Sequence, residues 1–198
     1  TTLSADEIHQ IGLDEVKRIK GEMEQVKDRT GFTGDLPAFF AYLRTDPQFR
    51  FESPEQLVDA YLALKEKVAA AIPGQFSVVP KSDFEVRRVE PFREQSEATA
   101  SYMPGTPDGV RPGVFYVNTY DLSSRPTYTS ESIFLHEAIP GHHFQISLQQ
   151  EIADLPRFRR FGGDTAYVEG WGLYAESLGR DLGMYTDPYQ YFGSLTAE

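Results

Sequence analysis

The sequence predicts a mostly helical α+β fold with a small β-sheet or hairpin, on three observations. Residues 1–75 repeat the three- and four-residue apolar spacing of amphipathic helices, so we expect a helical scaffold there. Residues 76–120 change to short alternating runs between turn residues, the pattern of a small β region. Residues 121–198 return to helical patterns and hold three of the four histidines. No linker or internal repeat divides the chain, so we expect one unit over residues 1–198.

The helical scaffold is predicted to contain three helices. The first covers residues 4–30, where Ser4 and Glu7 make a capping box and the apolar residues recur on one face, which we expect to be buried. The second covers residues 36–44. The third covers residues 53–73 and begins with a serine N-cap followed by a proline at the first helical position.

Three short strands are expected in the β region. Phe84 and Val86 alternate with charged neighbours, residues 99–102 form a brief β-like run, and residues 113–118 are the best strand in the chain. Two interpretations stay open. The strands either only pack on the helix that follows, or one of them presents a free sheet edge that pairs with an extended peptide beside that helix.

The run H-E-A-I-P-G-H-H at residues 136–143 places three histidines beside a carboxylate. Zinc prefers imidazole nitrogen and carboxylate oxygen, and a catalytic zinc keeps three protein ligands with one position open for water. The residues therefore suggest a Zn²⁺ site, with His136 as a ligand and Glu137 as the neighbouring general base. The rival interpretation is an ordinary buried helix whose polar residues are hydrogen-bonded.

The spacing departs from the common H-E-x-x-H motif because Pro140 occupies the usual place of the second histidine. On an ideal helix His142 lies roughly 120° away from His136, while His143 faces the same way but about 10 Å along the axis. A bulge at Pro140 and Gly141 can absorb two extra residues and return His142 to the ligand position. We therefore favour His142 over His143 as the second ligand.

A further helix is predicted from the Asp164–Thr165 cap to about Leu182, with Gly183 as its terminator. Gly170 and Gly172 inside it cost about 1 kcal/mol each relative to alanine. We expect a packing reason for both glycines, the close approach of a second helix.

The same helix carries Glu169 and Glu176, which are seven residues apart and so on nearly the same face. One carboxylate can bind the metal while the other orients a histidine ligand. The alternative is two surface carboxylates, with Glu176 paired to Arg180 one turn later. For Glu169 we expect burial, because its neighbours are Val168, glycine and tryptophan.

Composition excludes several kinds of partner. The net charge of −11 and the isoelectric point near 4.8 argue against nucleic acid and against anionic membranes. No run of 18 apolar residues is present, so we expect no membrane span, and the first residues lack a signal-peptide pattern. The absence of cysteine excludes disulfides and thiolate ligands, while the compartment and the oligomeric state stay open.

Three runs together resemble the DUF885 family of bacterial proteins. They are H-E-A-I-P-G-H-H-F-Q at 136–145, R-P-G-V-F-Y-V-N-T at 111–119 and G-G-D-T-A-Y-V-E-G-W-G-L-Y-A-E at 162–176. The resemblance covers nearly the whole chain and places it with the gluzincin-type zinc metallopeptidases, whose members are longer. It implies a zincin-like core, of which this chain is a central catalytic segment. It also implies zinc bound by His136, His142 and Glu169.

The function expected from these arguments is zinc-dependent hydrolysis of a peptide substrate. Glu137 acts as the general base, Glu176 orients a histidine ligand, and the oxyanion donor is expected among His143, Tyr116 and Tyr174. Two rivals belong to other classes. One is a non-catalytic helical module stabilised by a closed four-ligand zinc, and the other is a metal-free binding or scaffold domain.

Overall fold

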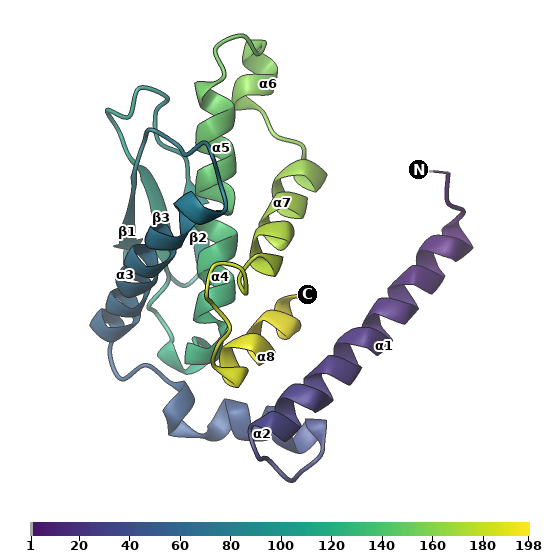
Figure 1. The fold of residues 1–198 in the computed structure, drawn as a ribbon. Helices are drawn as coiled ribbons and strands as arrows, with labels where there is room; N and C mark the ends of the chain where they lie inside the picture. Colours follow the sequence, from purple (N-terminus) through teal and green to yellow (C-terminus); the bar gives the residue numbers. More distant parts are fainter. Residues whose placement is uncertain (1) are drawn as a thin grey trace.

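The computed structural model describes residues 2–198 and has the predicted α+β architecture (Figure 1). The α-helices are α1 (Ala5–Arg29), α2 (Leu36–Thr45), α3 (Pro54–Ala71), α4 (Ser130–Glu137), α5 (His142–Glu151), α6 (Arg157–Phe161), α7 (Thr165–Ser177) and α8 (Pro188–Ala197). The strands are β1 (Phe84–Arg88), β2 (Ala100–Met103) and β3 (Gly113–Val117). In Figure 1, α4 and α5 form a column through the middle of the molecule, with the sheet on one side and α7 on the other. None of the helices within residues 2–198 has both the length and the apolar character needed to cross a membrane.

The sheet has the order β1-β3-β2, so the strand predicted most strongly is the central one. β3 runs parallel to β1 and antiparallel to β2, and all five of its residues are buried. Its backbone groups are therefore paired on both sides. β2 is an edge strand, and it lies beside α4 and α5. A free edge near the histidine helices is thus provided by β2.

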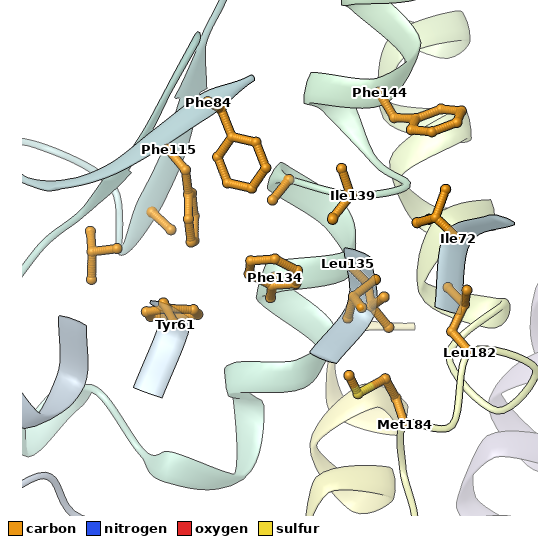
Figure 2. Packing of buried hydrophobic residues seen from close by; sticks show 14 of the residues in the cluster. Tyr61, Ile72, Phe84, Phe115, Phe134, Leu135, Ile139, Phe144, Leu182 and Met184 are labelled. Atoms are coloured by element: carbon orange, nitrogen blue, oxygen red, sulfur yellow. The ribbon is translucent and has the colours of Figure 1, made fainter. Parts of the chain in front are cut away.

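The main hydrophobic core fills the space between the sheet, α3 and α4. Figure 2 shows Phe115 of β3 and Phe134 and Leu135 of α4 at its centre, all three fully buried. The Tyr61 ring of α3 meets the Phe115 ring edge-on at 5.0 Å. This packing fixes α4, the helix that carries the first histidine of the motif, against the sheet.

The helix α1 begins at the predicted capping box, in which Ser4 and Glu7 bond each other's backbone N–H groups. The prediction of a buried face along the whole helix is wrong. Its buried residues are Met23, Val26 and Lys27, near the C-terminal end, whereas Val16 is 49% exposed. The reason is visible in Figure 1, where the first half of α1 extends away from the body of the molecule.

The predicted bulge at Pro140 and Gly141 is a complete break between two helices. The helix α4 ends at Glu137 and α5 begins at His142. Only glycine fits at position 141, because a Cβ atom there would lie 1.8 Å from the carbonyl oxygen of His136. From the other side, the indole Nε1–H of Trp171 in α7 donates to the Pro140 carbonyl at 2.7 Å. The break is therefore held in place by α7.

The C-terminal helices differ from the prediction in one boundary. Asp164 caps α7 and Asp187 caps α8 with their side chains, as expected for these residues. However, α7 ends at Ser177 rather than near Leu182. The chain continues in turns to Gly183, whose φ of +74° suits glycine at the end of such a segment.

Candidate metal centre

Three potential metal ligands come together from three helices. His136 lies in the last turn of α4, His142 is the first residue of α5, and Glu169 lies in α7. The Nε2 atoms of the two histidines are 3.3 and 3.6 Å from Oε2 of Glu169. All three ligand atoms lie within 4.8 Å of one another.

These separations suit a shared ion better than direct hydrogen bonds. Zinc–nitrogen and zinc–oxygen bonds of about 2.0–2.1 Å in a tetrahedron place two ligand atoms about 3.3 Å apart. A hydrogen bond to a carboxylate from a ring N–H is shorter, about 2.7–2.9 Å. Two imidazoles and one carboxylate are also a donor set that zinc prefers. The residues present therefore fit Zn²⁺.

Glu176 holds the other side of the His136 ring. Its Oε1 lies 2.8 Å from His136 Nδ1, and its second oxygen accepts a hydrogen bond from Ser132. This contact is the main cause of the raised pKa of His136. A proton held on Nδ1 leaves the Nε2 lone pair directed at Glu169, the arrangement by which carboxylates orient metal-binding histidines. The alternative ion pair with Arg180 does not occur in the described part of the chain.

Gly172 allows α7 to approach this histidine. A Cβ atom at position 172 would lie 2.6 Å from Cε1 and 2.7 Å from Nε2 of His136. The prediction that a second helix approaches closely at the glycine is therefore confirmed for Gly172. The same prediction is wrong for Gly170, where a Cβ atom would meet nothing within 4 Å.

His142 is buried, and its Nδ1 has no hydrogen-bond partner among the described residues. Burial is the first cause that lowers its pKa, and the neighbouring charge of His136 is the second. A neutral ring is the form that binds metal. The nitrogen that faces Glu169 is therefore free to coordinate.

Glu169 is more open than predicted, since 54% of its side chain is exposed. The expectation of burial fails because the first turns of α7 lie at the surface, with Tyr167 also exposed. The candidate centre consequently faces solvent on the α7 side.

Glu137 is the last residue of α4 and follows His136 directly. Burial is the main cause that raises the pKa of its carboxyl, and the charge of Glu169 raises it further. His136 and the backbone N–H of Tyr102, which hydrogen-bonds the carboxylate, act in the opposite direction. A carboxylate with a raised pKa is a better proton acceptor near neutral pH.

The three residues predicted as oxyanion donors lie elsewhere. His143 is buried against the sheet, where its Nδ1 lies 2.9 Å from the hydroxyl of Tyr102. Tyr116 alternates with Phe115 along β3 and packs with Val89 on the other face of the sheet. Tyr174 is half exposed and lines a cavity of about 530 Å³ between α7, α1 and α8. In the described residues no hydrogen bond or ring contact joins any of these three side chains to the side chains of His136, His142 or Glu169, so we do not retain them as donors.

Tyr102 is the residue that sequence reasoning missed. It bonds His143 through its hydroxyl and Glu137 through its backbone. The pattern of residues 99–102 predicted a strand, but nothing in that pattern indicated which strand would lie next to the helices. The pairing order of the sheet supplies that information.

The fold and the site together define an α+β protein with a candidate two-histidine, one-glutamate metal centre. The chain belongs to the family described as "Bacterial protein of unknown function (DUF885)", whose model matches residues 1–198. It is similar to the crystal structure of a "putative lipoprotein from Colwellia psychrerythraea", with 34% identity and a TM-score of 0.92. The match covers 100% of this chain and 35% of that one, so this chain spans about a third of that protein's length. No curated protein matches the chain.

Proposed function

We propose that this chain carries the active site of a zinc-dependent hydrolase that cleaves peptide bonds. The observation that supports this most is the convergence of His136, His142 and Glu169 from three helices, with Glu137 beside the first. Three protein ligands leave one position open, as in catalytic zinc sites. The exposure of Glu169 gives that position access to solvent.

Each residue has a distinct role in the proposed reaction. Bound zinc would supply Lewis-acid chemistry, which activates water and polarises a carbonyl group. Glu137 accepts the proton of the attacking water and passes it to the leaving amine. Glu176 holds the proton on Nδ1 of His136 and so keeps Nε2 free to coordinate.

The edge strand β2 supports an extended peptide as the substrate. The carbonyl of Thr99 accepts a hydrogen bond from Asn118 N–H at 3.0 Å. Because antiparallel backbone groups alternate in direction, those of Ala100 and Tyr102 face the free edge. Addition of an extended peptide to such an edge is a common mode of recognition. The Tyr102 N–H faces Glu137, whose pKa it lowers, so this edge lies next to the proposed base. The Ala100 N–H and carbonyl and the Tyr102 carbonyl are the groups left to pair with a peptide.

Two rival functions are less well supported. A closed structural zinc needs a fourth protein ligand, and the cluster found in residues 2–198 has three members. Glu176, a further carboxylate beside His136, is already bonded to Nδ1 of His136 and to Ser132. In a metal-free hydrogen-bonded core, His142 Nδ1 would be buried without a hydrogen-bond partner. The distances from the histidine Nε2 atoms to Glu169 would also be long for hydrogen bonds.

The test compares Glu137→Gln with the wild-type full-length protein. Zinc content is measured by elemental analysis, and cleavage of a mixed peptide library is read as new termini by mass spectrometry. We expect unchanged zinc and a fall in cleavage of about 10²–10⁴-fold, the usual contribution of a general base. Glu151→Gln, the same change near the end of α5, is the matched control and should cleave normally. Equal cleavage by Glu137→Gln would exclude Glu137 from the mechanism, and zinc without any cleavage would favour the structural-zinc rival.

A further inference from the structure

His143 is a buried side chain that contacts two strands of the sheet. Its ring centroid lies 4.7 Å from that of Phe84 in β1, and its Nδ1 lies 2.9 Å from the hydroxyl of Tyr102 in β2. Gly113 of β3 makes this contact possible, because a Cβ atom there would lie 2.3 Å from the Tyr102 hydroxyl oxygen. The histidine therefore joins the first turn of α5 to the edge strand.

The Nδ1 atom of His143 is engaged by the edge strand. It lies 2.9 Å from the Tyr102 hydroxyl, within hydrogen-bond distance. The hydroxyl of Ser147 lies farther from Nδ1, at 3.4 Å. Tyr102 is therefore the main partner of this nitrogen.

Tyr102 is thereby held at two points. Its hydroxyl lies 2.9 Å from His143 Nδ1 of α5, and its strand packs against α4, where its backbone N–H faces Glu137 and lowers the pKa of that carboxyl. His142, which directly precedes His143, is a candidate metal ligand. The position of the β2 edge is therefore tied to the two helix ends that flank the metal centre.

We propose that His143 is a positioning residue that, through Tyr102, fixes the β2 edge relative to Glu137 and the metal centre, so that an extended peptide pairs in a productive register. The peptide in this proposal rests on the proposed function. The fixing of β2 by His143 does not, and it is tested separately below.

The first experiment measures amide hydrogen exchange over residues 100–103 in the zinc-loaded full-length protein. We expect Tyr102→Phe and His143→Phe each to speed exchange in this segment about tenfold, the effect of losing one good hydrogen bond. Tyr116→Phe is the matched control, since it removes a hydroxyl from the opposite face of the sheet, and it should leave exchange unchanged. Unchanged exchange in both test variants would overturn the proposal even if the protein cleaves no peptide.

The second experiment separates positioning from the other roles open to His143. A positioning residue for the peptide edge should raise KM in Tyr102→Phe and His143→Phe with kcat nearly unchanged, because pairing is lost equally in the ground and transition states. His143→Gln, which keeps one acceptor and one donor, should restore KM in part. A fall in kcat at constant KM would instead make His143 a transition-state donor. Loss of zinc would make His143 a metal ligand.

A measurement on the wild type guards against variants that fail to fold. Nitrogen NMR of histidine-labelled protein should show Nδ1 of His143 in a hydrogen bond. An Nδ1 without a hydrogen-bond partner would contradict the contact with Tyr102 on which the proposal depends.

Discussion

Replacing Gly172 with alanine is expected to displace the His136 ring and so disrupt the metal centre. The added Cβ would lie 2.6 Å from Cε1 of His136, whereas carbon atoms in contact are about 3.5–4.0 Å apart. The ring must therefore move by about 1 Å. It is held at Nδ1 by Glu176 at 2.8 Å, and its Nε2 lies 3.3 Å from Glu169, so both contacts are disturbed. We expect zinc affinity to fall about 10- to 100-fold, as when a group that orients a ligating histidine is lost.

The same substitution two residues earlier provides the control. A Cβ at Gly170 meets nothing within 4 Å, so Gly170→Ala should leave zinc affinity unchanged and stabilise α7 by about 0.5–1 kcal/mol. In contrast, Gly172→Ala should lower the free energy of unfolding by about 1–3 kcal/mol through overpacking. Zinc affinity is measured by competition with a chromophoric chelator, and stability by urea unfolding of the metal-free protein. Equal zinc affinities for the two variants would refute the close approach of α7 to His136.

Three further predictions follow from the same geometry. His142→Ala should lose bound zinc while His143→Ala retains it, as measured by elemental analysis, and the reverse result would transfer the ligand role to His143. Burial lowers the pKa of His143 from 6.5 to about 4, so the unfolded state binds its proton first as the pH falls. For this reason the free energy of unfolding of the metal-free protein should fall by about 3 kcal/mol between pH 6.5 and 4. If the free energy of unfolding of His143→Gln falls as steeply with pH as that of the wild type, His143 is not the cause. Phe115→Ala should cost about 3–5 kcal/mol in urea unfolding, and a cost below 1 kcal/mol would contradict its place at the core centre.

Much of the fold could be predicted because its signals are local. Helix starts at Ser4, Ser53 and Asp164 depend on a side chain bonding a backbone N–H two or three residues away, which the sequence displays directly. The strands were found for the same reason, from alternation over four or five residues. The order of the strands and the projection of α1 depend on contacts between distant segments, so they could not be predicted.

The candidate site was predicted as far as residue chemistry and helical spacing allow. These features pointed to His136 and His142 as ligands and to Glu169 and Glu176 as one ligand and one orienting carboxylate, and the family resemblance implied that Glu169 is the ligand. The structure brings the four residues together. The donor residues could not be predicted, because the direction of a side chain in a sheet depends on which face is covered. Tyr102 was missed for that reason.

Trp171 gives this centre a property that needs no label. It is the only tryptophan in the chain, and its indole N–H donates to the Pro140 carbonyl in the break between the two histidine-bearing helices. The tryptophan fluorescence of this chain therefore comes from an indole at the contact between α7 and that break. Any event that shifts α7 relative to the α4–α5 column changes the hydrogen bond and the solvent exposure of this indole. Its emission thus reports, in real time, on the contact between α7 and the α4–α5 break, which brings Glu169 to the two histidines.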